Sequence, residues 1–196
     1  MKMVAKPSRR NLIEKGVDMN HKVIDNFLDE EYFDSLVNLF TDKERPGHID
    51  QNHDIPWYFT SKIVDEGDEI GKSFYMTHMF YNGHIPFSPL YNELIPLLEK
   101  LEVKCLLRIK ANLYPNTHTL HEHSMHSDYD FSHSAAILSL NTCDGYTKLR
   151  DGTKIDSIAN RILLFDASEK HCSTTTTNVP ARINININYI HEQFHE

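Results

Sequence analysis

The sequence predicts a mainly β protein of the α+β class, in which a jelly-roll core (a double-stranded β-helix) carries an N-terminal helical layer. From Val103 onward the chain is a series of short strand-like segments, separated by turn signals such as Asp144-Gly145 and Asp151-Gly152. Many short strands with such turns indicate a double-sheet core. Before Val103 two segments are predicted helices. We therefore expect the core over residues 103–190, within a single domain over residues 1–196.

The N-terminal part is predicted to be an arm followed by a strand and a capped helix. Residues 1–20 are basic and polar, which is typical of a loose arm, and residues 21–28 read as a strand. Asp29 is then a predicted N-cap, because acidic residues follow it in the first turn and residues 32–40 have helical spacing.

The next elements are a loop, two strands and a second helix. Proline and glycine over residues 43–56 indicate a loop, which is a candidate lid, whereas residues 56–64 and 73–81 are rich in aromatic and β-branched residues and read as strands. Residues 88–101 are a predicted helix, although Pro96 is awkward in its interior. Trp57 either packs this layer on the core or forms an aromatic wall of a pocket.

Composition excludes several classes of function. The formal net charge of −8 over 196 residues makes nucleic acid a poor partner, because phosphates repel an acidic chain. No apolar run has the roughly 18–20 residues of a membrane helix, and the N-terminus lacks the apolar region of a secretory signal. Three widely spaced cysteines argue against a disulfide framework. We therefore expect a cytoplasmic protein that does not bind membranes.

Two predicted strands alternate between polar and apolar residues. The polar positions of one are Arg108, Lys110, Asn112 and Tyr114, and those of the other are Arg182, Asn184, Asn186 and Asn188. Alternate residues of a strand share a face, so each set lies on one side of its strand. Each polar face is either solvated or lines a pocket near the histidine-rich segment 118–133. For Arg108 and Lys110 we expect the solvated alternative.

A candidate metal site begins with His126 and Asp128. On an extended chain these two side chains point the same way and can approach one ion. His171, 45 residues after His126, is the best third ligand. Two histidines and one carboxylate that leave positions open are the facial triad of non-haem Fe(II) oxygenases. Arg182, eleven residues past His171, could bind the carboxylate of a cosubstrate.

Four segments in order (LYP, HSDY, LLF with KH soon after, and ARIN) resemble the 2-oxoglutarate/Fe(II)-dependent oxygenase superfamily. The most similar members are small, prolyl-4-hydroxylase-like proteins of the kind met in phages and marine bacteria. The resemblance covers about residues 105–190, and VIDNFLDEEYFDSL is similar to the strand and helix that usually precede that core. One departure is Ser139, where some relatives have a second tyrosine.

The resemblance implies a role for each matching residue. His126, Asp128 and His171 are the implied iron ligands, and Arg182 with Tyr114 would hold the distal carboxylate of 2-oxoglutarate. Asn112 is a weaker candidate on the same face. The implied cofactors are Fe(II), 2-oxoglutarate as cosubstrate and O2. The implied reaction is hydroxylation of an unactivated C–H bond, first of all in a prolyl or other amino-acid side chain of a peptide, protein or small molecule. Nucleic-acid demethylation is disfavoured, because Asn188 stands where that group has a second arginine.

Two alternatives stay open. One is a cupin-type metal site that begins at His121 and His123; the HExxH zinc motif itself fails, because Met125 stands where its second histidine is needed. The other is a non-catalytic jelly-roll module that binds a metal or a carboxylate. For His118, His121, His123 and His133 we nevertheless expect positions near the pocket without a metal role.

Overall fold

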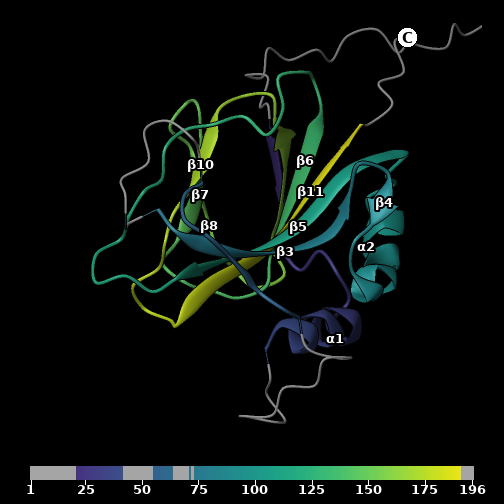
Figure 1. Ribbon diagram of the computed structural model, residues 1–196, viewed down its shortest axis with the longest axis horizontal. Coiled ribbons are helices and arrows are strands. Elements are labelled where there is room, and N and C mark those ends of the chain that lie inside the picture. The colour runs from purple at the N-terminus through teal and green to yellow at the C-terminus, as the bar shows by residue number, and fades with distance from the viewer. Residues whose placement is uncertain (1–20, 42–54, 64–70, 72, 191–196) are drawn as a thin grey trace, which may run out of the picture.

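The computed structural model describes residues 21–41, 55–63, 71 and 73–190 (Figure 1). The arm expected over residues 1–20, and all but the last two residues of the expected loop 43–56, lie outside the described residues. The domain boundaries therefore stay a prediction.

Strands are the commonest regular structure in the described chain and form two antiparallel sheets. The larger sheet contains β1 (His21–Ile24), β2 (Tyr58–Thr60), β3 (Tyr75–Asn82), β4 (Ile85–Pro86), β5 (Cys105–Pro115), β6 (Ser134–Ser139), β9 (Ile162–Asp166) and β11 (Ala181–Ile190). Its order is β1-β9-β6-β11-β5-β3-β2, with β4 paired to β3. The smaller sheet contains β7 (Tyr146–Leu149), β8 (Lys154–Asp156) and β10 (His171–Ser173), in the order β10-β7-β8. The predicted mainly β jelly-roll class is confirmed.

The first helix begins where the sequence predicts. In α1 (Glu30–Phe40) the Asp29 side chain accepts a hydrogen bond from the backbone N–H of Tyr32, which satisfies one of the free donors at a helix N-terminus. The preceding strand is shorter than expected, since only residues 21–24 pair with β9.

The single helix expected over residues 88–101 is instead two short helices. A 3-10 helix, η1 (Pro89–Leu94), is followed by α2 (Ile95–Lys100). Pro96 consequently lies in the first turn of α2, where its missing N–H and fixed φ angle are tolerated. The proline marks the boundary between the two helices.

The helices cover one face of the larger sheet, and the smaller sheet lies on the opposite side (Figure 1). Leu36 of α1 and Leu97 of α2 pack in one hydrophobic core with apolar residues of β5 and β11, including Ile109 and Ile185, which are fully buried. Burying each such side chain stabilises the fold by about 1.5–3 kcal/mol. The apolar positions of β5 and β11 thus face the helices, so their polar positions must face the smaller sheet.

The polar face of β11 is buried, and that of β5 is buried at Asn112 and Tyr114 and half-buried at Arg108 and Lys110. Arg182, Asn184, Asn186 and Asn188 are each less than 9% exposed. Residues of β5 and β11 line a cavity together with Thr147 of β7 and His171 of β10, so the two sheets face each other across it. The expectation that Arg108 and Lys110 are solvated is wrong, because both line this cavity. The helices already occupy the other face of the sheet, and the jelly roll closes over this one.

Candidate metal centre

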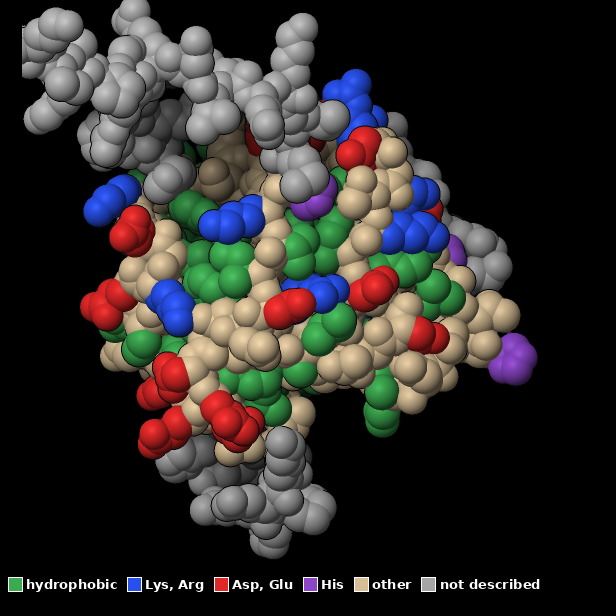
Figure 2. Space-filling view, turned by 180° about the vertical axis from the view of Figure 1, so that it is seen from behind, with side chains coloured by type: hydrophobic (Ala, Val, Ile, Leu, Met, Phe, Trp, Pro, Cys, Tyr) green, Lys and Arg blue, Asp and Glu red, His purple; other side chains and the backbone are tan. Residues whose placement is uncertain are grey.

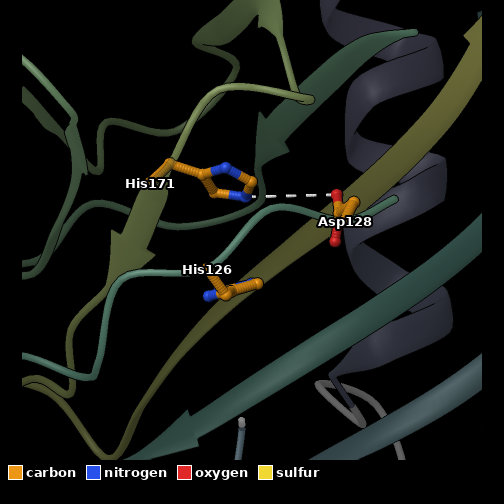
Figure 3. Close-up of side chains that lie close together, drawn as sticks. All are labelled: His126, Asp128 and His171. Atoms are coloured by element: carbon orange, nitrogen blue, oxygen red, sulfur yellow. Dashed lines mark ion pairs between the residues drawn. The ribbon is translucent and has the colours of Figure 1, made fainter. Parts of the chain in front are cut away.

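Three potential metal ligands meet between the two sheets. The imidazoles of His126 and His171 and the carboxylate of Asp128 offer ligand atoms that all lie within 4.8 Å of one another. His171 Nε2 is 4.0 Å from Asp128 Oδ2 (Figure 3). Within the described ranges this is the one group of three or more metal-ligating side chains. The structure therefore brings together the three residues predicted from the sequence.

A backbone bridge sets the distance between the two histidines. The His126 N–H donates to the carbonyl of His171 at 2.9 Å, and the His171 N–H donates back at 2.8 Å. The two imidazole rings are consequently 4.8 Å apart between centroids. His126 and Asp128 were expected on a regular strand. They lie instead in an irregular segment that forms an isolated β-bridge with β10 at His126 and His171.

Asp128 is held by side chains from the larger sheet. Its Oδ1 accepts a hydrogen bond from Arg108 at 2.7 Å, and its Oδ2 accepts from Asn188 at 2.7 Å and from Asn186 at 3.3 Å. Burial by itself raises the pKa of Asp128, but the charges of Arg108 and His171 and the Asn188 amide outweigh burial and hold the pKa well below its usual range. Asp128 is therefore a carboxylate at neutral pH.

Both histidines are neutral at neutral pH, as metal ligands must be. Burial lowers the pKa of His171 to about 4, against the opposing influence of the Asp128 charge. Burial likewise lowers the pKa of His126. His171 Nδ1 lies 3.1 Å from the carbonyl of Glu169, to which it donates if it carries the proton. That tautomer leaves the Nε2 lone pair directed at the triad.

A second polar group lies further along the same two strands. Arg182 is 1% exposed, and its guanidinium carbon lies 5.4 Å from the centroid of the Tyr114 ring, opposite which it is paired in the sheet. It donates to Thr147 Oγ1 at 2.9 Å and to the carbonyl of Thr174 at 3.3 Å. Its Nε has no hydrogen-bond partner among the described residues. A buried guanidinium with an unused donor is suited to a carboxylate ligand.

Asn112 lies between the triad and this arginine. Its amide donates to Asn184 Oδ1 at 2.9 Å, while its own Oδ1 is buried and, within the described chain, has no partner. The polar faces of β5 and β11 thus form a ladder whose rungs are the pairs 108/188, 110/186, 112/184 and 114/182. The triad contacts the first end of the ladder, and Arg182 is at the other end.

Gly145 makes room for Arg182. A Cβ atom at this position would lie 2.8 Å from Arg182 Cδ and 2.6 Å from the Thr175 carbonyl oxygen, both closer than real Cβ atoms approach. Sequence reasoning used Asp144-Gly145 only as a turn signal. The glycine also allows β7 to approach the arginine closely.

The other histidines of the segment 118–133 and Trp57 lie outside the triad. His121 Nε2 lies 3.1 Å from Ser73 Oγ, and His123 Nδ1 lies 3.0 Å from Ser173 Oγ. Neither belongs to a three-ligand group in the described part of the chain, so a cupin-type site there gains no support. His118 is exposed, and His133 is buried, outside the triad. Trp57 packs against the core, 6.1 Å from the Phe40 ring.

The residues present fit an iron ion and a dicarboxylate. Two neutral imidazoles and one carboxylate are the ligand set that leaves open positions on a non-haem Fe(II). The unpartnered Arg182 Nε and Asn112 Oδ1 are the kind of buried polar groups whose ligand is missing. The cavity that the triad lines together with Asn112 and Tyr114 has a volume of about 370 Å³, which is within the usual range for small-molecule sites.

Figure 2 shows basic side chains interspersed with acidic ones on one face of the molecule, without a continuous basic patch there. This pattern agrees with the acidic net charge. A search of the described helices finds none long and apolar enough to span a membrane.

Comparison with solved structures relates this fold to oxygenases. The chain is similar to the viral collagen prolyl hydroxylase of Paramecium bursaria Chlorella virus-1 in complex with 2-oxoglutarate (TM-score 0.54, 12% identity, 88% of this chain and 98% of that chain covered). It is also similar to a Pseudomonas putida prolyl-4-hydroxylase (0.53, 13%, 88% and 93%) and to a 2-oxoglutarate-Fe(II) oxygenase family protein of Burkholderia pseudomallei (0.59, 9%, 88% and 86%). No family model and no curated protein matches the sequence. At these identities the likeness establishes the fold, and it confirms the resemblance at that level.

Proposed function

We propose that this protein is an Fe(II)- and 2-oxoglutarate-dependent dioxygenase that hydroxylates an unactivated C–H bond. The observation that carries the proposal is the buried group of His126, Asp128 and His171, which shares a polar ladder with the unsatisfied guanidinium of Arg182. Structures of prolyl hydroxylases with the same fold support it.

The three ligands are prepared for a metal ion by their surroundings. Burial keeps both imidazoles neutral, and Arg108 with Asn188 holds the Asp128 carboxylate in its ionised form. When bound there, Fe(II) with 2-oxoglutarate and O2 supplies the oxidising chemistry of the reaction. The protein contributes orientation and a partly closed polar cavity.

Arg182 and Tyr114 are the proposed site for the far carboxylate of 2-oxoglutarate. Both lie at the end of the ladder away from Asp128, so a dicarboxylate that chelates the metal at one end can reach them at the other. Asn112, between these two ends, is positioned to donate or accept a hydrogen bond along the cosubstrate. Holding both ends of the cosubstrate fixes its orientation before reaction.

The proposed substrate is an amino-acid side chain, with proline the first candidate. Two of the solved structures with this fold are prolyl hydroxylases, which supports that order. The cavity, about 370 Å³ in volume, would hold the cosubstrate together with the reacting side chain of the substrate.

An anaerobic titration tests the proposal. Adding Fe(II) and 2-oxoglutarate to the protein should produce the weak visible charge-transfer absorption of this class of complex. The Asp128→Ala variant should lose both the absorption and any succinate formation. Full activity in Asp128→Ala would contradict the triad assignment. A non-catalytic jelly-roll module would bind the metal or the carboxylate but form no succinate with any of a panel of proline peptides and free amino acids under air.

A further inference from the structure

A further cationic side chain lines the cavity, and no acidic residue in the described part of the chain forms an ion pair with it. Lys110 projects from β5, one rung from Arg108, and lies opposite Asn186 of β11 and Met79 of β3. Its ammonium donates a long hydrogen bond to Tyr75 Oη at 3.4 Å and lies 5.4 Å from the centroid of that ring. Among the described residues it makes no ion pair. Placing an unpaired lysine here is costly to the fold, which points to a ligand.

The proposed cosubstrate does not account for Lys110. Its far carboxylate belongs at Arg182 and Tyr114, and Tyr114 is four residues from Lys110, roughly 13 Å along the strand. Asp128, the nearest carboxylate of the triad, is already engaged by Arg108 and two asparagine amides. Even with the metal and the dicarboxylate in place, the charges of the ion and of Arg182 outweigh those of the two cosubstrate carboxylates. The cavity therefore keeps a positive excess at Lys110.

We propose that Lys110 binds a carboxylate of the substrate, so that the substrate is an acid: an amino acid with a free carboxylate, or an acidic residue beside the oxidised side chain. This inference rests on the proposed function. Lys110 is paired with Asn186, which donates a hydrogen bond to Asp128. A small substrate whose carboxylate binds Lys110 would therefore lie close to the metal. Lys62 also lines the cavity.

Matched acids and amides test this assignment by calorimetry. Anaerobic protein with Mn(II) and saturating 2-oxoglutarate is titrated with L-proline against L-prolinamide, and with the peptide Gly-Pro-Glu against Gly-Pro-Gln. The wild type should bind the acid of at least one pair about tenfold or more tightly than its amide, the size of effect that one charged hydrogen bond gives. A preference within the proline pair would indicate a free amino acid as substrate, and a preference within the peptide pair would indicate an acidic peptide.

Three variants test whether Lys110 itself is responsible for the preference. Lys110→Met should abolish the preference for the acid while leaving the dissociation constant of 2-oxoglutarate within about threefold of wild type. Lys104→Met, which removes an exposed lysine outside the cavity, should change neither. Lys110→Arg should retain part of the preference, because it keeps the charge.

Three outcomes would overturn the assignment. One is that no acid in the panel binds wild type more tightly than its amide, absence of any binding included. Another is that Lys110→Met keeps the preference. The third is that Lys110→Met weakens 2-oxoglutarate binding tenfold or more, which would mean that Lys110 binds the cosubstrate and not the substrate. Failure of the proposed function is recognised separately, because the wild type would then show no charge-transfer absorption with Fe(II) and 2-oxoglutarate.

Discussion

The guanidinium of Arg108 donates to Asp128 Oδ1 at 2.7 Å and to the side-chain oxygen of Asn188 at 2.9 Å, while Asn188 donates in turn to Asp128 Oδ2. The carboxylate is thus held at both oxygens by neighbouring strands of one sheet. Its ion pair with Arg108 is largely buried, with side chains 16% and 5% exposed. Such a pair fixes the orientation of Asp128, the proposed metal ligand.

Replacing Arg108 should weaken metal binding. We expect Arg108→Met to raise the dissociation constant for Fe(II) or Co(II) about 10–100-fold, because Asp128 loses the partner that fixes its orientation and its ionised state. Anaerobic metal titration measures the effect. Arg150→Met is the matched control, because Arg150 forms an exposed ion pair with Glu169 on the surface. If Arg108→Met bound metal as wild type does, Asn186 and Asn188 alone would suffice to hold Asp128.

The metal-free protein should lose stability in mildly acidic solution. His171 has an ordinary pKa of 6.5 and a folded pKa of about 4, so between these values the unfolded state binds more protons. Stability therefore falls as pH drops from about 6.5 to 4, by up to roughly 3 kcal/mol for this residue. Asp128 adds a further loss only at lower pH, since its pKa is lowered.

Urea unfolding at pH 7, 5.5 and 4.5 checks this dependence. His171→Gln should show a shallower decline over the same range, because it removes the group that is forced to stay neutral. His118→Gln is the control, since His118 is exposed. A decline equally steep in His171→Gln would assign the effect to the other buried histidines, such as His78, whose pKa burial also lowers.

Gly145→Ala should damage the cosubstrate end of the pocket. The added methyl would meet Arg182 Cδ and the Thr175 carbonyl, and overpacking of this kind costs about 1–3 kcal/mol. We also expect 2-oxoglutarate to bind about tenfold or more weakly, because Arg182 must shift from its place beside Tyr114. Calorimetry at fixed Mn(II) measures the binding, and thermal unfolding measures the stability. Unchanged 2-oxoglutarate binding in a folded variant would mean that Arg182 is not at the cosubstrate site.

The sequence predicted the architecture and the triad for identifiable reasons. The alternation along ARINININYI and RIKANLY predicted that each polar set lies on one side of its strand. The HSD and KH segments indicated that His126, Asp128 and His171 form one group, and these residues do lie together in the structure. Asp29 was recognisable as an N-cap because an acidic first turn and helical spacing follow it.

The sequence could not say which side of the sheet was closed by the rest of the molecule. Arg108 and Lys110 were therefore expected in solvent, although the smaller sheet encloses them. Nor could it identify the partners of Asp128, because Arg108, Asn186 and Asn188 are 20, 58 and 60 residues away from it in the sequence. Long-range register of this kind is set by tertiary packing rather than by local pattern.

Removing the Lys110 charge should stabilise the protein. Burial, together with the nearby charge of Arg108, lowers the pKa of Lys110 from 10.5 to about 8 despite the opposing influence of Asp128. The folded state thus holds the proton less firmly than the unfolded state does, and stability rises with pH between about 8 and 10.5. We expect Lys110→Met to raise the free energy of unfolding at pH 7 by about 1–2 kcal/mol, because an apolar side chain of similar length replaces the ammonium.

Urea unfolding at pH 7, 9 and 10 measures both effects. The variant should lose the part of the alkaline rise that Lys110 contributes, while Lys104→Met, in the exposed control position, should keep it. A stabilised variant that no longer distinguishes acids from amides would mean that the fold tolerates an unfavourable charge in order to bind an anion. If Lys110→Met were instead less stable than wild type, the contact between Lys110 and Tyr75 would have a mainly structural role.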